Sequence, residues 1–79
     1  MTKDEILADI QEIFRIELKL PELVLNLETT PEHIPQWDSL NHAVLVGLVR
    51  DHFKVKLKLS DVIKLKSIGD FCDLVYEEV

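Results

Sequence analysis

The chain has 79 residues, which allows one domain, expected over residues 1–79, and is too short for two. With 47% apolar residues and only two glycines, the composition indicates a folded helical protein, not a disordered chain or a turn-rich β structure. The formal net charge of −6 argues against nucleic acid as a partner, because an acidic protein repels phosphate backbones.

The first predicted element is a helix that begins after Thr2. Thr2 and Glu5 have the spacing of a capping box, in which each side chain bonds a backbone N–H at the helix start. Apolar residues then recur at helical spacing and form one stripe: Ile6, Leu7, Ile10, Ile13 and Phe14. Pro21 cannot continue a helix, so we expect the helix to end near residues 18–20.

A long connection with three prolines follows, over residues 19–38. A connection of this length without structure of its own is uncommon in a small domain and is often functional. Thr30 followed by Pro31 predicts one short helical turn at residues 31–34. Apolar residues in the first half of the connection are expected to hold it against the core: Leu23, Val24, Leu25 and Leu27.

A second long helix is predicted to begin at Asp38 or Ser39 and to run to about Phe53. Asp38 suits the N-cap, because its carboxylate accepts a backbone N–H and favours the positive end of the helix. The helix is apolar over much of its circumference. Such a helix usually lies at the centre of a bundle or presents one face to a partner, and we expect both here.

Residues 54–59 alternate lysine with apolar residues, and this period of two is typical of a strand. No partner strand is apparent and a lone strand leaves its backbone groups unpaired, so we expect an extended loop held by Val55 and Leu57. Ser60 is expected to cap a short helix over residues 61–65.

The last predicted helix opens with a second capping box, formed by Ser67 and Asp70. Its apolar stripe consists of Ile68, Phe71, Cys72 and Val75. The predicted fold class is all-α: a four-helix bundle with three longer helices, one short helix and a long loop between the first two helices. The expected core includes Ile6, Ile10, Leu48, Phe53, Ile68 and Phe71.

Neither a membrane segment nor a disulfide nor a metal site is expected. No apolar run approaches 18 residues and no signal-peptide pattern opens the chain, which predicts a cytoplasmic protein. Cys72 is the only cysteine and is expected to be a small buried apolar residue. His33, His42 and His52 do not have the spacing of metal ligands.

The sharpest local feature is Trp37-Asp38-Ser39-Leu40, at the start of the second predicted helix. A serine at a helix start is usually a cap, but Asp38 can fill that role here and leave the Ser39 hydroxyl exposed. A phosphate ester is favoured at this place, because unpaired N–H groups and the helix dipole attract anions. Trp37 is expected to hold the loop to the bundle.

Asp38-Ser39-Leu40 resembles the modification motif of acyl carrier proteins, and the resemblance in length, charge and element order covers essentially the whole chain. The stretch from Ile34 to His42 is most similar to stand-alone carriers. The resemblance implies that a phosphopantetheinyl transferase attaches 4′-phosphopantetheine to Ser39 through a phosphodiester. It further implies that the arm holds acyl groups as thioesters, and that Asp38 helps the transferase to position its metal ion.

The resemblance also implies two further partners, an acyl-loading ligase or transferase and an acyl-using synthase or transferase. Typical fatty-acid carriers have a second helix rich in acidic residues, whereas residues 41–54 contain a single acidic residue, Asp51. Asn41, Val44 and Gly47 occupy partner-facing positions where acids or a methionine are usual. We therefore expect a different partner set, in a polyketide or other specialised pathway and not in housekeeping fatty acid synthesis.

His42 lies one turn after Ser39, and our hypothesis is that it contacts the phosphate or a partner. Asp38, Ser39 and His42 do not fit a catalytic triad, because Asp38 lies beside the nucleophile and not behind His42, so no enzyme activity is predicted. Two alternatives stay open: an aminoacyl or peptidyl carrier, whose usual Gly-Gly before the serine is absent, and an unmodified helical interaction module. A monomer is expected, and weak dimerisation stays open.

Overall fold

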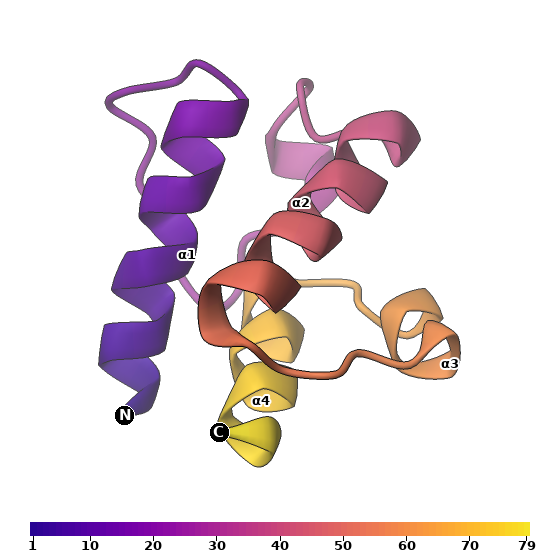
Figure 1. Ribbon diagram of the computed structural model, residues 1–79. Helices are drawn as coiled ribbons and strands as arrows, with labels where there is room; N and C mark the ends of the chain where they lie inside the picture. Colours follow the sequence, from indigo (N-terminus) through magenta and orange to yellow (C-terminus); the bar gives the residue numbers. More distant parts are fainter.

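Four α-helices and one 3₁₀ turn form the fold in the computed structural model, which describes residues 1–79 (Figure 1). In chain order these are α1 (Lys3–Glu17), η1 (Pro31–His33), α2 (Ser39–Phe53), α3 (Leu59–Ile63) and α4 (Ile68–Glu78). α1 packs against both α2 and α4, and the short α3 lies at the side of the bundle. The predicted all-α bundle, with its long loop between the first two helices, is confirmed.

The capping boxes position α1 and α4 as predicted. The Thr2 hydroxyl accepts from the Glu5 N–H at 3.2 Å, and the Glu5 carboxylate accepts from the Thr2 N–H at 2.9 Å. Ser67 and Asp70 make the same exchange at the start of α4. The buried positions of the two helices match the predicted stripes: Ile6, Ile10 and Phe14 in α1, and Ile68, Phe71, Cys72 and Val75 in α4.

The long connection is held by hydrogen bonds to its backbone and by only some of the apolar side chains that were predicted to hold it. The Gln11 side chain accepts from the Leu25 N–H at 2.8 Å, and Leu25 is buried. Leu23 is half-buried, but Val24 is 72% exposed and Leu27 is also exposed. The prediction that Val24 and Leu27 would pack on the core was therefore wrong, because polar contacts to the backbone already fix this segment.

The connection also contacts the start of α4 through its backbone. The Thr29 carbonyl accepts from the Ile68 N–H at 2.9 Å, and the Leu27 carbonyl accepts from the Gly69 N–H at 2.8 Å. The first N–H groups of a helix have no partner within the helix, so these two bonds satisfy donors that α4 leaves unpaired. The loop passes so close to Gly69 that a Cβ atom there would lie 2.8 Å from the Leu27 oxygen.

The two glycines give a matched pair of stability predictions. Gly69→Ala is expected to lower the free energy of unfolding by about 1–3 kcal/mol, because the added methyl overlaps the backbone of the connection. Gly47→Ala in α2 is expected to raise it by up to about 1 kcal/mol, because alanine favours the helix and nothing lies within 4 Å of the new Cβ. Urea denaturation followed by circular dichroism measures both, and two variants of equal stability would contradict the close approach at Gly69.

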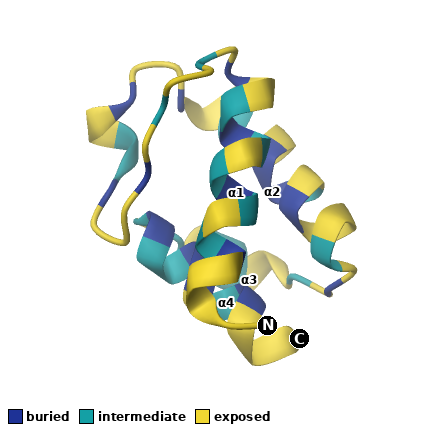
Figure 2. Cartoon of the chain, turned by 90° about the vertical axis from the view of Figure 1, so that its left-hand side faces the viewer, coloured by how far each residue is buried: buried dark blue, intermediate teal, exposed yellow.

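α2 has an inner and an outer apolar face. It begins at Ser39 with Asp38 as N-cap and ends at Phe53, as predicted. Its buried residues face α1 and the core, whereas its outer side is exposed (Figure 2). Leu40 is 76% exposed and Leu48 is 38% exposed. The prediction that Leu48 is a core residue was therefore wrong, because α2 lies at the edge of the bundle and packs through one side only.

Lys54 ends α2 in the left-handed conformation, and residues 55–58 after it form no strand, as predicted, with Val55 buried and Leu57 half-buried. The short helix after them begins earlier than expected. α3 spans Leu59–Ile63 with Lys58 at the N-cap and no side-chain cap, so the prediction that Ser60 caps a helix over residues 61–65 was wrong. Packing of Val62 on the core positions this helix, not a local cap.

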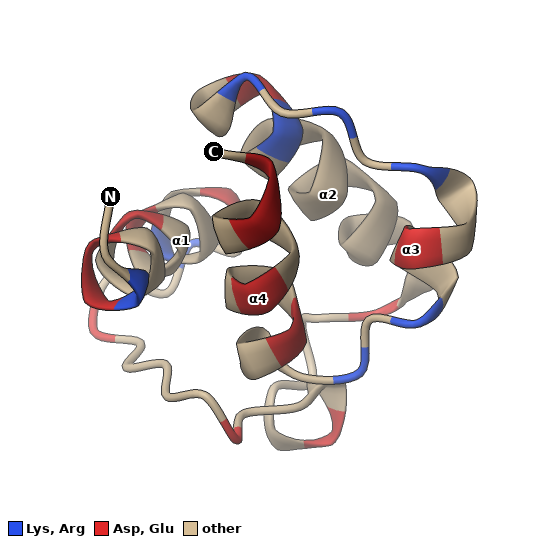
Figure 3. Ribbon diagram, turned by 90° about the horizontal axis from the view of Figure 1, so that it is seen from below, with Lys and Arg blue, Asp and Glu red and all other residues tan.

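Charge is divided between two sides of the molecule. Acidic side chains lie along α1 and α4, and lysines follow the segment between α2 and α3 and both ends of α3 (Figure 3). Residues 50–66 contain six basic and two acidic side chains. None of the helices combines the length and the apolar character that a membrane span requires.

Candidate functional site

Ser39 is the first residue of α2, and its side chain is exposed. Asp38 caps the helix: its carboxylate accepts from the Asn41 N–H at 2.9 Å. The Ser39 hydroxyl takes part in no hydrogen bond with the rest of the chain, since the capping role is already filled. An unpaired hydroxyl at the positive end of a helix is available for chemistry, and an anion attached to it would be stabilised there.

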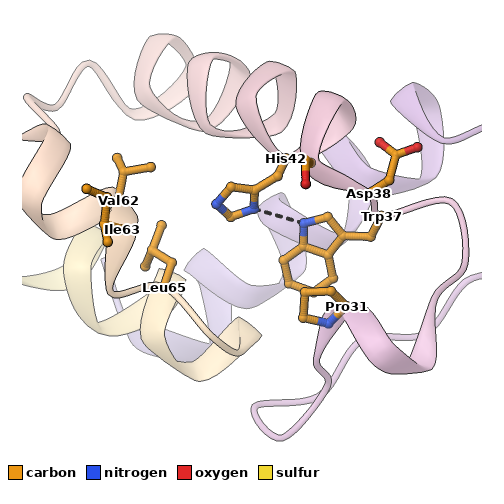
Figure 4. Close-up of a pocket in the computed structure, with 8 residues that line it drawn as sticks. Pro31, Trp37, Asp38, His42, Val62, Ile63 and Leu65 are labelled. Carbon is orange, nitrogen blue, oxygen red and sulfur yellow. Dashed lines mark hydrogen bonds between the residues drawn. The ribbon is translucent and has the colours of Figure 1, made fainter.

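A groove of about 540 Å³ opens beside Ser39 (Figure 4). It runs between the start of α2, the η1 turn and α3. Val62 and Ile63 of α3, together with Leu65, which lies two residues after the end of α3, are opposite the start of α2 (Figure 4). The lining residues are Pro31, Trp37, Asp38, Ser39, His42, Val62, Ile63 and Leu65. A groove of this size and composition can cover a short apolar chain attached next to it.

Trp37 joins the core to this groove. Its side chain is 4% exposed, and its ring packs edge-on against Phe14 with a centroid distance of 5.0 Å. The Phe71 ring lies 6.2 Å from it. Trp37 therefore holds the end of the long connection to the bundle, as predicted, and one side of its ring also lines the groove.

His42 turns towards Trp37 and into the groove (Figure 4). The Trp37 Nε1–H donates to His42 Nδ1 at 3.0 Å, and the two rings lie side by side with an interplanar angle of 25° and their centroids 6.0 Å apart. Burial lowers the pKa of the His42 imidazole below its usual value, and the backbone of Val62 partly offsets this effect. The ring is therefore neutral at neutral pH, with Nδ1 as an acceptor and its proton on Nε2.

Comparison with known proteins adds to this geometry. No family model matches the sequence, and no curated protein matches it significantly. Among solved structures, the holo acyl carrier protein from Geobacter metallireducens is 38% identical to this chain, with a TM-score of 0.85 over 91% of this chain and 83% of that chain. The chain belongs to the acyl carrier protein family.

A second solved structure supports the fold of this carrier protein. The acyl carrier protein from Thermotoga maritima has a TM-score of 0.79 over 96% of this chain and 88% of that chain, at 23% sequence identity. This match confirms the order and arrangement of the helices. Both similar structures are acyl carrier proteins by their description.

The other predicted site residues of the carrier lie in different surroundings. Leu40 and Val44 are exposed on the outer side of α2. Asn41 is half-buried, and its side-chain amide donates to the Gln36 carbonyl at 2.8 Å, so it closes the loop before α2. Gly47 is half-buried, with open space beyond its Cα. Of the predicted residues, only Asp38, Ser39 and His42 are brought together at the groove.

The opposite wall of the groove escaped prediction. Val62, Ile63 and Leu65 line it, although they lie more than twenty residues from Ser39 in the sequence. Val62 and Leu65 have the i, i+3 spacing of a helix face, and this was the one local signal that could have marked them. Nothing in the sequence indicated that this face would lie opposite the start of α2.

The Cys72 thiol is buried and is not a reactive group in this carrier. The Cys72 side chain is fully buried, and burial raises the pKa of its thiol to about 11. A thiol of this kind is almost entirely protonated at neutral pH and is a poor nucleophile. No group of three or more metal-ligating side chains is present.

Proposed function

We propose that this acyl carrier protein carries 4′-phosphopantetheine on Ser39 and holds acyl groups as thioesters at the end of that arm. The observation that carries the proposal is the exposed, unbonded Ser39 hydroxyl at the start of α2, next to a mostly apolar groove. The expected partners are a phosphopantetheinyl transferase, an acyl-loading ligase or transferase, and a synthase or transferase that uses the acyl group.

The residues around Ser39 fit the attached group. In the modification, the Ser39 oxygen forms a bond to the β-phosphorus of coenzyme A, the phosphoanhydride bond breaks, adenosine 3′,5′-bisphosphate leaves, and the serine proton passes to solvent or to the transferase. The N–H groups and dipole at the start of α2 stabilise the resulting phosphodiester anion. Asp38 is exposed beside it and is proposed to help the transferase to place its metal ion.

The attached arm supplies a thiol that activates an acyl group as a thioester. The chain itself supplies cover: Val62, Ile63 and Leu65 form an apolar wall opposite Ser39, and Trp37 closes the groove from the core side. Apolar cover excludes water from the first atoms of the cargo. A long flexible arm then delivers the group to several enzymes, with effective concentration replacing free diffusion.

Intact mass tests the proposal directly. Apo protein incubated with coenzyme A and a broad-specificity transferase should gain the mass of one phosphopantetheine group. A mass that never changes would support the unmodified interaction module instead. Loading of the modified protein by acyl ligases and not by aminoacyl ligases then separates an acyl carrier from an aminoacyl carrier.

The charge distribution supports a specialised pathway over housekeeping fatty acid synthesis. The outer side of α2 is apolar, with Leu40, Val44 and Leu48 exposed. Further along, the exposed lysines of residues 54–66 form no ion pair (Figure 3). A partner surface with a basic rim suits a carrier with an acidic second helix. On this carrier such a rim would meet the lysines and be repelled by them. Charges at the rim of an interface govern the association rate and the choice of partner.

The partner set gives a measurable prediction. A ketoacyl synthase of housekeeping fatty acid synthesis is expected to use the acyl form of this carrier with a kcat/KM at least about tenfold lower than for its own carrier, mainly through slower association. Replacing Lys54, Lys56 and Lys58 by glutamate should recover part of the loss. Efficient turnover of the unchanged carrier would refute the assignment to a specialised pathway.

A further inference from the structure

The His42 imidazole is a polar group in the otherwise apolar part of the groove, and its hydrogen bond with Trp37 fixes its orientation. The indole nitrogen of Trp37 can only donate a hydrogen bond, so His42 Nδ1 must accept it. The neutral imidazole then carries its proton on Nε2. This N–H points away from Trp37, towards α3 and the groove (Figure 4).

The Nε2–H donor has no side-chain partner in the chain. The hydrogen bond from Trp37 is the only one of the ring with full geometry, and the Val62 backbone, which offers the ring a weaker hydrogen bond, is its other polar neighbour. Both surfaces next to the donor, the His42 ring and the Val62 side chain, line the same groove as Ser39. An oxygen atom that enters the groove from Ser39 can therefore reach a donor that is already oriented.

We infer that His42 Nε2–H is a specificity-determining donor that favours acyl groups with a keto or hydroxyl oxygen near the thioester over fully saturated chains. This inference rests on the proposed attachment at Ser39. A saturated chain that fills the groove covers the donor and leaves it only the weak hydrogen bond to the Val62 backbone, and a poorly compensated buried donor is costly. An oxygenated chain accepts the bond, so the same groove holds it more strongly.

The aromatic packing explains how the donor is kept in place. The His42 ring lies beside the Trp37 ring with an interplanar angle of 25°, and it packs at a steep angle against Phe71, with 5.9 Å between centroids. Two aromatic neighbours and one hydrogen bond leave the ring little rotational freedom. A preoriented donor loses less entropy when it binds, which strengthens its selectivity.

The experiment compares two cargoes of equal length on the same carrier. Apo protein is loaded by a transferase with coenzyme A analogues that bear amide-linked hexanoyl or 3-oxohexanoyl groups. Occupancy of the groove is read from the fluorescence of Trp37, the only tryptophan, and from the methyl shifts of Val62 and Leu65. The 3-oxo group should occupy the groove about tenfold more than hexanoyl, and the ¹⁵N shift of His42 Nε2 should move only with the 3-oxo group.

Matched variants separate the donor from the shape of the groove. His42→Phe keeps an aromatic ring in the same place without a donor and should make the two cargoes equal. His52→Phe, at the exposed far end of α2, should leave the tenfold ratio unchanged. Should His42→Phe fail to fold, the Nε2 shift and the occupancy ratio of the unchanged protein still decide the question.

Each remaining outcome has a defined meaning. A protein that gains no mass refutes the proposed attachment. A protein that is loaded but holds both cargoes equally, or one whose preference persists in His42→Phe, overturns the role of His42 and leaves the carrier function intact. A preference with no change at Nε2 also overturns it.

Discussion

Ser39→Ala is expected to abolish phosphopantetheine attachment completely. The substitution removes the oxygen that bonds to phosphorus, and no neighbouring hydroxyl lies at the start of α2. Because Asp38 caps the helix and Ser39 is exposed and unbonded, folding should be preserved, with a change in unfolding free energy within about 0.5 kcal/mol. Intact mass after incubation with coenzyme A and transferase measures the first effect, and thermal denaturation measures the second.

Ser60→Ala provides the matched control. Ser60 is also an exposed serine near the start of a helix, but it lies inside α3 and makes no cap. Its replacement should leave the extent of modification unchanged. Attachment that persists in Ser39→Ala would place the arm elsewhere, and an unfolded Ser39→Ala would show that the serine, not Asp38, stabilises the start of α2.

Phe71→Ala is expected to lower the free energy of unfolding by about 3–5 kcal/mol. The Phe71 side chain is fully buried, and its ring packs edge-on against Phe14 at 6.1 Å between centroids. It also supports Trp37 and His42, so the cavity would lie directly beneath the groove. A domain of this size has a total stability of roughly 4–12 kcal/mol, so the variant should be partly or largely unfolded at 37 °C.

Urea denaturation followed by Trp37 fluorescence measures this loss, and Tyr76→Ala is the control. Tyr76 lies on the same helix but is 48% exposed, with Lys3 over its ring. Its loss should cost no more than about 1 kcal/mol, since an exposed cation–π contact is weak. Equal stability of the two variants would contradict a core centred on Phe71.

Local chemistry made the starts of α1, α2 and α4 and the exposed serine predictable. The pairs Thr2 with Glu5 and Ser67 with Asp70 each satisfy backbone donors within three residues, so their effect does not depend on the rest of the fold. Asp38 caps α2 in the same local way and thereby leaves Ser39 free. The apolar stripes of α1 and α4 were likewise readable, since each helix has one dominant face.

Features that depend on several elements were not predictable in this way. On α2, Val49 and Leu48 are equally apolar neighbours, yet packing against α1 buries the first and leaves the second exposed. Ser60 has the chemistry of a cap, but α3 takes its position from the burial of Val62 and begins before Ser60. At Ser60, non-local packing outweighed a local capping preference worth about 1 kcal/mol.

By itself, the sequence determined the helical class, the starts of α1, α2 and α4, and the exposure of Ser39, because hydrogen bonds between residues three or four apart govern these features. Only the tertiary structure decided that α3 lies opposite the start of α2, that the two enclose a groove, and that Trp37 orients His42 within it. Such contacts join residues distant in the chain, and their free energy comes from the burial of surfaces that meet only when the whole core has formed.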